Sequence, residues 1–563
     1  MPRPHARVAL LALVAFLPLA CTSPDRQPEP EPEKPPPLLG NLGRHHRRIT
    51  TKSAGAQRWF DQGLVLAFAF NHDEAIRSFR ECAKLDPTCA MAWWGIALCN
   101  GPHINNATMD AERSAAAWQA LGKARVLATE ASPVERALVE ALTSRYADPP
   151  PEDRAPLDRA YAEAMKQAWR AHPKDADVGA LCAEALMDVH PWDLWTASGT
   201  AKPHTPEIVE TLEKVLAAAP DHPLANHLYI HAVEASSRPD RGTASADRLR
   251  KLVPGAGHLV HMPAHIYART GRWADAAAAN ERAIEVDREY RARSPKQGFY
   301  SVYMGHNHQF LAWASMMEGR SHVALEEARA MAATFPPEAI EALAPFVDGV
   351  IALPYTALSR FGRWEEILAE PEPPAYLPVT RALRHFARGT ALAAMGKHDE
   401  AEAERQALEE IAGGLKEGTT VGNSQAKDIL GIASHALAGE IAAQRGETDA
   451  AVEHLGKAIA LEDGNKYDEP PDWPQPVRHS LGAVLLRAGR AAEAEKVYRE
   501  DLVRWPENGW ALWGLARALE KQDRRREAEE VQARFAKSWS RADVQIDTTC
   551  LCLPGIAGAS GTR

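Results

Sequence analysis

The sequence lacks the short motifs that mark several enzyme classes. It has no Gly-x-x-x-x-Gly-Lys-Ser/Thr phosphate loop, no Gly-x-Ser-x-Gly nucleophile, no Cys-x-x-Cys-His haem attachment and no His-Glu-x-x-His zinc motif. No serine or cysteine has an obvious base partner nearby in the sequence. The motifs therefore assign no catalytic residue. Any enzyme built from this chain would have to use a metal held by side chains that the fold brings together.

Aromatic residues and clustered positive charge are also scarce. Aromatics make up 7% of the 563 residues, and the formal net charge is −10. No long basic run follows the N-terminus, and binding to nucleic acid depends on neutralising phosphates with basic side chains. We therefore expect no nucleic acid among the partners. The apolar share of 45% and charged share of 25% are typical of globular proteins.

Apolar runs without charge are short, and the clearest one lies near the N-terminus. Residues 8–17 follow Arg3 and Arg7, and this run is too short to span a bilayer, as in a secretory signal. The next residues, Leu-Pro-Leu-Ala-Cys over 17–21, resemble the bacterial lipobox. The resemblance implies a lipoprotein-type signal peptide over residues 1–20 and lipid attachment at Cys21. It also implies export to the bacterial cell envelope as a membrane-anchored protein that faces the periplasm or the outside. Ordinary cleavage with release is the alternative.

A stretch rich in proline and glutamate follows the predicted lipidation site. It covers residues 22–37 and belongs to a spacer that we place at residues 21–52. Such a composition favours an extended, semi-rigid chain. The spacer would hold a folded domain away from the membrane.

Cysteine is rare, with six residues left after Cys21. Cys82, Cys99 and Cys182 lie in segments with helical periodicity, which predicts buried thiols. Cys550 and Cys552 lie in a tail, residues 541–563, that has no such periodicity. We expect free thiols there, with a soft-metal site or a small closed loop as alternatives.

From about residue 55 the sequence repeats a pattern of small and aromatic residues. Trp59, Gly63, Ala75, Phe79 and Pro87 fall at positions 4, 8, 20, 24 and 32 of a 34-residue helix–turn–helix unit. This pattern resembles the tetratricopeptide repeat (TPR). Small residues at positions 8 and 20 allow the two helices of a unit to pack closely, and the proline at position 32 ends the second helix. A turn glycine near position 15 adopts a helix-ending conformation.

The resemblance extends along most of the chain and sets the predicted fold. We expect an all-α TPR-like solenoid, a right-handed superhelix of about a dozen helix pairs with a concave groove. We divide it into an N-terminal array over residues 53–350 and a C-terminal array over 351–540. The predicted pairs start near residues 56, 90, 133, 176, 223, 257, 305, 348, 382, 432, 475 and 509.

Histidines recur with the period of the repeat. His227 and His231 are four residues apart, and His261 and His265 repeat that spacing 34 residues later. Residues four apart lie on one face of a helix. In the repeat frame these positions line the groove of a TPR protein, so the four imidazoles are predicted to converge. Pro263 interrupts this pattern, because a proline inside a helix removes a backbone donor.

Other residues at neighbouring groove positions add to these four histidines and complete a candidate site. Zinc is bound through nitrogen at about 2.0–2.1 Å, and adjacent helices are near enough for their side chains to share an ion. The predicted metal ligands are His227, His231, Glu234, His258, His261, His265, His306 and Glu184. The predicted substrate contacts are Arg269, Gln309, Trp313, Asp188 and His190.

The residue types suit a divalent transition metal, namely zinc, iron or copper. If the protein is an enzyme, the sequence favours a metal-dependent hydrolase or oxygenase in which the metal activates water or dioxygen, with Glu234 or Glu184 as ligand or base. The alternative is a metal-free TPR scaffold whose groove binds a peptide or protein partner in the cell envelope. A network of structural hydrogen bonds among the histidines is a third interpretation.

Overall fold

The fold is known from a computed structural model, which describes residues 36–294, 297–335 and 337–553. The predicted signal peptide over residues 1–20 and the predicted lipidation site at Cys21 lie outside these residues. Helices dominate the described chain. The strands in this part are β1 (Thr420–Val421) and β2 (Ser424–Gln425), which form one antiparallel hairpin.

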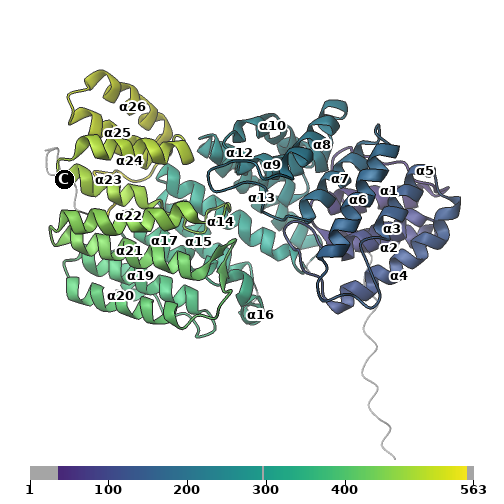
Figure 1. The fold of residues 1–563 in the computed structure, drawn as a ribbon, viewed down its shortest axis with the longest axis horizontal. Coiled ribbons are helices and arrows are strands. Elements are labelled where there is room, and N and C mark those ends of the chain that lie inside the picture. The colour runs from purple at the N-terminus through teal and green to yellow at the C-terminus, as the bar shows by residue number, and fades with distance from the viewer. Residues whose placement is uncertain (1–35, 295–296, 336, 554–563) are drawn as a thin grey trace, which may run out of the picture. The chain divides into compact units, whose positions relative to one another are not determined.

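The helices follow one another with short connections (Figure 1). Up to residue 293 they are α1 (Ala54–Phe68), α2 (His72–Leu85), α3 (Ala90–Asn100), α4 (Ala111–Leu127), η1 (Ala128–Glu130), α5 (Pro133–Leu142), α6 (Ala155–Ala171), α7 (Ala176–Asp188), α8 (Thr205–Ala218), α9 (Pro223–Glu234), η2 (Pro239–Gly242), α10 (Thr243–Leu252), α11 (Gly257–His261), α12 (Pro263–Arg269) and α13 (Trp273–Arg293). The later ones are α14 (Tyr300–Glu318), α15 (Ser321–Ala333), α16 (Pro337–Val347), η3 (Val350–Ala352), α17 (Leu353–Arg360), α18 (Trp364–Ala369), α19 (Pro378–Ala394), α20 (His398–Gly413), α21 (Ala426–Gln444), α22 (Thr448–Gly464), α23 (Val477–Arg487), α24 (Ala491–Arg504), α25 (Gly509–Glu520) and α26 (Arg525–Ser538).

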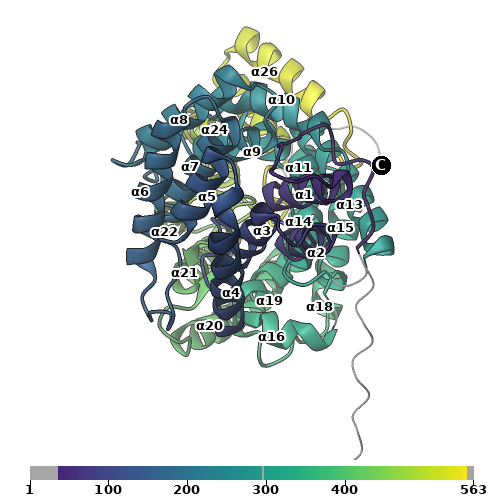
Figure 2. The same cartoon turned by 90° about the vertical axis from the view of Figure 1, so that its right-hand side faces the viewer.

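Successive helices pack as antiparallel pairs, which confirms the predicted fold class. Within the described residues the pairs run from α1/α2 to α25/α26, and α11 and α12 together form the first member of their pair with α13. With α16 outside any pair, this arrangement gives twelve pairs among the described residues. Six predicted starts, 90, 133, 176, 223, 257 and 509, coincide with the first residues of α3, α5, α7, α9, α11 and α25. Between pairs, α1 also contacts α9, and the two lie close together in Figure 2.

Glycines at position 8 allow the close packing that the repeat pattern predicts. A Cβ atom on Gly63 would lie 2.7 Å from Cε1 of Phe79, and one on Gly95 of the next pair would lie 2.6 Å from Cε2 of the same ring. Tyr498 is enclosed in the same way. Cβ atoms on Gly482 and Gly514 would lie 2.3 Å and 2.2 Å from its Cζ atom. In these two places, one buried aromatic ring of the second helix thus fits between two glycines.

The turn glycines predicted near position 15 have the expected backbone conformation. Gly396, Gly446 and Gly489 have φ angles of +79°, +80° and +75° and follow the first helices of their pairs. This left-handed conformation is nearly free of strain only for glycine.

The C-terminal tail corrects one prediction. Cys550 and Cys552 form a disulfide and are buried, so the prediction of free thiols is wrong, and the alternative of a small closed loop holds. The tail docks on the last pairs, because Thr549 Oγ1 donates to the carbonyl of His479 at 2.7 Å and Tyr498 Oη lies 2.7 Å from Thr549 Oγ1. The predictions for Cys82, Cys99 and Cys182 are confirmed, since all three are buried free thiols.

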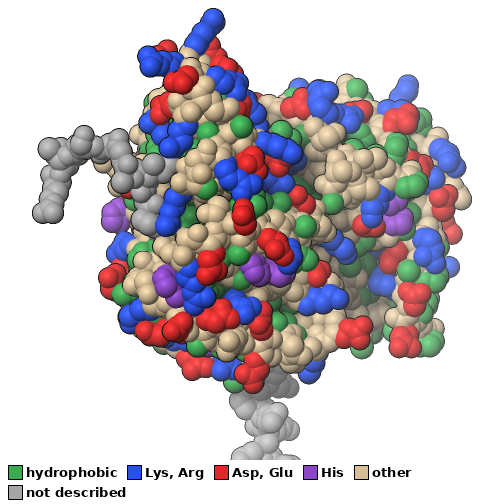
Figure 3. Space-filling model, turned by 60° about the vertical axis from the view of Figure 1, so that its left-hand side comes forward, with side chains coloured by type: hydrophobic (Ala, Val, Ile, Leu, Met, Phe, Trp, Pro, Cys, Tyr) green, Lys and Arg blue, Asp and Glu red, His purple; other side chains and the backbone are tan. Residues whose placement is uncertain are grey.

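The surface mixes charges of both signs. On the face shown in Figure 3, Lys and Arg side chains are interspersed with Asp and Glu. None of the helices in the described part of the chain is both long enough and apolar enough to cross a membrane.

Candidate metal centre

Six histidines from four helices meet at one place. His227 and His231 come from α9, His258 and His261 from α11, His265 from α12 and His306 from α14. All are buried except His306, which is half-buried. The helix breaks at Met262 because Pro263 has no amide hydrogen to donate. Two short helices replace one long one, and the three histidines around the break still face the cluster.

The first group consists of His227, His231 and His258. Their ligand atoms lie within 4.8 Å of one another. The ring centroids of His227 lie 5.1 Å from His231 and 4.9 Å from His258. His227 Nδ1 donates to the carbonyl oxygen of Phe68 at 2.9 Å, and His231 Nδ1 donates to Glu234 Oε1 at 2.8 Å. The Nε2 atoms of both rings, and both nitrogens of His258, have no hydrogen-bond partner.

The second group consists of His261, His265 and His306, again with ligand atoms within 4.8 Å of one another. His261 Nδ1 lies 2.7 Å from Asn280 Oδ1, and His265 Nδ1 lies 2.5 Å from Glu234 Oε2. His306 Nδ1 lies 3.3 Å from Oε1 of Gln309. The Nε2 atoms of His261 and His265 face each other at 2.8 Å.

The hydrogen bonds fix which nitrogen carries the proton. A carbonyl oxygen can only accept, so His227 Nδ1 is the protonated nitrogen. The amide of Asn280 donates its Nδ2 to the carbonyl of Ala276, which turns its Oδ1 toward His261. The Nδ1 atoms of five rings therefore donate outward, and in the neutral rings the five Nε2 atoms carry lone pairs that point into the cluster.

Glu234 joins the two groups. Its two oxygens accept from His231 in the first group and from His265 in the second. Burial acts to raise the pKa of Glu234, but the rings of His265 and His231 outweigh it and hold the pKa at about 2. A carboxylate that accepts from the outer nitrogens of two histidines orients both rings and makes their Nε2 atoms more basic.

Burial favours the neutral form of four imidazoles of the cluster, those of His227, His258, His261 and His306. Burial, together with repulsion from neighbouring histidines, lowers the pKa values of His227, His258 and His261 well below the usual range. Burial likewise lowers the pKa of His306 to about 3. Neutral rings are the form that can donate a lone pair to a metal.

A cavity of about 510 Å³ opens beside the cluster. His231, His258, His265 and His306 form part of its wall. A second cavity of about 330 Å³ reaches His231 and Glu234 from another side. Trp192 lines both cavities, and its ring stands nearly perpendicular to that of His231 with centroids 5.3 Å apart.

The sequence did not reveal the acidic loop that covers the cluster. Asp468 and Glu469 line the larger cavity, and Glu469 Oε2 lies 3.6 Å from His265 Nδ1. The sequence of residues 468–473 favours a rigid connector, and it lies roughly 160 residues after His306, the last histidine of the cluster, outside the repeat spacing. Asn280 and the carbonyl of Phe68 were also missed, since nothing in their local sequence distinguishes them.

Two acidic residues predicted for the site lie elsewhere. Glu184 is not among the residues grouped with the histidines. It lies near the buried guanidinium of Arg145, which donates to Asp188 Oδ2 at 2.6 Å. Burial raises the pKa of Glu184 to about 7, and that of Asp188 well above its usual range. The carboxyl groups of Glu184 and Asp188 therefore interact with the buried guanidinium of Arg145 instead of the histidine cluster.

Of the other predicted substrate contacts, two line a cavity and two do not. Gln309 lines the larger cavity, and His190 lines the smaller one, where its ring stacks on His204 with centroids 3.7 Å apart. Trp313 is fully buried and packs against other aromatic rings. The guanidinium of Arg269 donates to the carbonyls of Glu234, Ser236 and Arg504.

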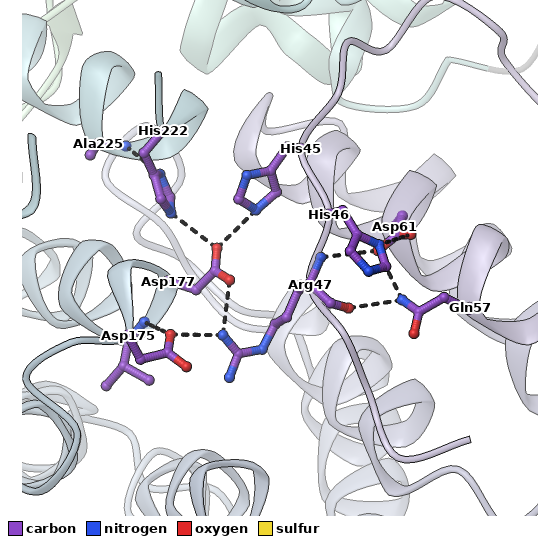
Figure 4. Close-up of polar contacts among 10 residues, drawn as sticks. His45, His46, Arg47, Gln57, Asp61, Asp175, Asp177, His222 and Ala225 are labelled. Atoms are coloured by element: carbon purple, nitrogen blue, oxygen red, sulfur yellow. Dashed lines mark hydrogen bonds and ion pairs between the residues drawn. The ribbon is translucent and has the colours of Figure 1, made fainter. Parts of the chain in front are cut away.

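A separate histidine–carboxylate group lies where the N-terminal segment, residues 36–53, crosses α7 and α9 (Figure 4). Asp177 Oδ1 is 2.9 Å from His45 Nε2 and 3.0 Å from His222 Nε2. His222 Nδ1 accepts the amide hydrogen of Ala225, so in the neutral ring Nε2 carries the proton and donates to Asp177. This group is therefore satisfied by its own hydrogen bonds, unlike the six histidines.

Comparison with known proteins supports the repeat. A family model described as tetratricopeptide repeat matches residues 56–89, the segment that contains α1 and α2. No curated protein matches the chain. Among solved structures, a chain of the human IFIT1 dimer with m7Gppp-AAAA is 14% identical over 87% of this chain and 91% of that chain, with a TM-score of 0.32. A chain of the APC/C hetero-tetramer Cut9–Hcn1 is 16% identical over 82% of this chain and 76% of that chain, also with a TM-score of 0.32. Likenesses of this degree say nothing of what this chain binds.

The repeat match and the twelve consecutive helix pairs agree with each other. The first helix pair matches the tetratricopeptide repeat, and the histidine cluster lies in the fifth, sixth and seventh helix pairs of the described chain.

Proposed function

We propose that the six histidines bind two divalent transition-metal ions. His227, His231 and His258 would hold one ion, and His261, His265 and His306 the other. Glu234 would act from outside both coordination spheres, through the Nδ1 atoms of His231 and His265. This assignment changes the role predicted for Glu234, from ligand to supporting carboxylate, and leaves Glu184 out of the site.

The observation that carries this proposal is the pattern of hydrogen bonds around the rings. Each of five histidines donates Nδ1–H to a carbonyl, amide or carboxylate oxygen and leaves Nε2 directed inward. Metal-binding histidines in proteins almost always have such an outer partner. Buried polar atoms are also rarely left without partners, and His227 Nε2, His231 Nε2 and both nitrogens of His258 have none.

Three imidazoles per ion favour zinc, iron or copper and leave coordination positions open. The larger cavity reaches histidines of both groups, so an open position would face it. A metal in such a site can activate water or dioxygen. We therefore propose a metal-dependent hydrolase or oxygenase, in which the cavity holds the substrate.

Elemental analysis of the purified protein tests the metal site. The wild type is compared with a His231→Ala/His265→Ala variant, which removes one ligand from each group. A His435→Ala/His454→Ala variant is the matched control, because these two histidines face each other on α21 and α22, outside the cluster. We expect about two ions per chain in the wild type and in the control, and loss of metal in the first variant while its helical circular dichroism persists. Absence of metal from the wild type after loading would overturn the proposal and favour the metal-free scaffold that binds a peptide or protein partner.

We further propose that the protein is exported and anchored to the bacterial cell envelope through lipid on Cys21. The support is the sequence of residues 1–21 alone. Metabolic labelling with palmitate tests it. We expect label in the wild type and none in a Cys21→Ala variant, whereas equal label in both would overturn the anchor.

A further inference from the structure

The wall of the larger cavity beside the histidines has two chemically different parts, which we call the histidine end and the apolar end. The histidine end consists of four histidines of the cluster and the carboxyl groups of Asp468 and Glu469. The apolar end includes Phe299, Val302, Tyr303, Phe335, Val347 and Val350, and it adjoins the histidine end, because the ring centroids of Tyr303 and His258 lie 4.4 Å apart. At about 510 Å³ the cavity is within the size range of small-molecule sites.

Positive charge is missing from this wall. None of the described residues that line the cavity is lysine or arginine, and two are acidic. The smaller cavity differs, because Lys202 and Lys466 line it. A phosphate, sulfate or carboxylate group needs basic donors when it leaves water. The described lining of the larger cavity offers such a group no lysine or arginine.

Unpartnered polar atoms lie at the histidine end. Glu469 is 2% exposed and His258 is 2% exposed, and Glu469 Oε2 and both nitrogens of His258 have no hydrogen-bond partner. Both residues line the cavity. Buried polar atoms of this kind need a ligand to satisfy them, so the reacting group of a bound molecule belongs at this end.

We propose that the cavity binds a small, uncharged molecule with a ring-sized apolar body and a polar reacting group. The body lies against the wall formed by Phe299, Val302 and Phe335, and the polar group lies between the histidines and Glu469. An anionic group such as a phosphate ester would find no lysine or arginine in this lining, so the proposed metal ions would have to neutralise it alone. This inference rests on the proposed metal site, because that site receives the polar group.

Three probes separate the metal site from the substrate cavity. Acetohydroxamic acid and benzohydroxamic acid are uncharged in solution and share a head that loses one proton to the solvent on binding a metal, and only the second has a ring. Phenylphosphonate has the ring and a negative charge. Binding of each to the metal-loaded protein is measured by calorimetry. We expect benzohydroxamic acid to bind at least about tenfold more tightly than acetohydroxamic acid, as burial of an aromatic ring predicts, and phenylphosphonate to bind at least about tenfold more weakly than benzohydroxamic acid.

A cavity-filling variant locates the ring. Val302 is half-buried on α14 and lines the cavity, so Val302→Trp fills the apolar end. The matched control is Val503→Trp, because Val503 on α24 is 82% exposed. We expect Val302→Trp to remove the preference for benzohydroxamic acid and to leave the binding of acetohydroxamic acid unchanged. The control is expected to preserve both affinities.

The outcomes distinguish two failures. If acetohydroxamic acid does not bind the metal-loaded protein, the open metal position fails, and this inference fails with it. If it binds but the ring adds no affinity, or Val302→Trp does not reduce the preference for the ring, the metal site stands and the apolar cavity is not the substrate site. Tighter binding of phenylphosphonate than of benzohydroxamic acid would overturn the uncharged substrate class.

Discussion

The Nε2 atoms of His261 and His265 face each other at 2.8 Å in the buried cluster. Both Nδ1 atoms already donate, to Asn280 and to Glu234. If both rings are neutral, two lone pairs point at each other across this short distance, which is repulsive. A shared cation removes the repulsion, and the other histidines of the cluster make a metal ion the better candidate than a proton.

Removal of metal is therefore expected to destabilise the protein. A ligand that binds only the folded state adds stability of RT ln(1 + [L]/Kd), which is about 4 kcal/mol at a thousandfold excess over Kd. We expect a strong chelator to lower the melting temperature of the wild type and added metal to restore it. The melting temperature is measured by circular dichroism. The His231→Ala/His265→Ala variant should show no response to the chelator, and a wild-type protein that is equally unresponsive would contradict the site.

Glu234→Gln tests the supporting carboxylate. The substitution keeps the size of the side chain but removes the charge that accepts from His231 and His265. Loss of an outer partner of a metal ligand lowers metal affinity by about 10–100-fold. Competition with a chelator of known affinity measures the change. Glu462→Gln is the matched control, because Glu462 is also buried but accepts from the amide of Val477 on a different helix pair. Equal affinities in the two variants would argue against the role of Glu234.

Arg47→Ala is expected to release the N-terminal segment. The guanidinium of Arg47 donates to Asp175 and Asp177 at 2.8 Å each and is 7% exposed. Removing one partner of a buried ion pair costs about 3–5 kcal/mol. Amide hydrogen exchange over residues 45–53 should therefore accelerate by about two to four orders of magnitude. The neighbouring Arg48 is exposed, so Arg48→Ala should leave the exchange unchanged. Similar exchange in both variants would show that the ion pairs do not hold the segment.

Glu440 predicts a pH dependence of stability. Burial raises its pKa to about 7, although the hydroxyls of Thr390 and Ser480 donate to it. The folded state therefore favours the protonated carboxyl. The contribution of Glu440 to the free energy of unfolding is fully present below its pKa in the unfolded chain, near 4.3. This contribution is lost as the pH rises to about 7, the pKa in the folded state. We expect Glu440→Gln to melt at a higher temperature than the wild type at pH 8 and at a similar temperature at pH 4.5. The exposed Glu453 provides the control, Glu453→Gln, which should follow the wild type at both pH values.

Much of the fold could be predicted from sequence because the repeat specifies it locally. Gly63 and Phe79 lie within one unit, and the pair they define is complete within 34 residues. The same spacing placed His227, His231, His261 and His265 in one cluster. His306 followed from the next unit. In each case the contact joins positions with fixed numbers in adjacent repeats.

The rest of the site depends on contacts that no repeat position specifies. Glu469 reaches His265 from an irregular loop between α22 and α23, and the β1–β2 hairpin contributes Thr420 to the same cavity. Glu184 occupies a groove position by its number, but its charge interaction is with the buried guanidinium of Arg145, and it is not grouped with the histidines. The positions of Glu184 and Glu469 therefore depend on electrostatic and loop contacts between distant parts of the sequence, which the repeat pattern does not predict.

The partners of the cluster are spread over much of the chain, from Phe68, whose carbonyl accepts from His227, to Glu469 beside His265. Phe68 and Glu469 are roughly 400 residues apart in the sequence. The cluster is therefore complete only when helix pairs from both arrays have assembled, so the proposed metal site would also report whether the two arrays are folded together.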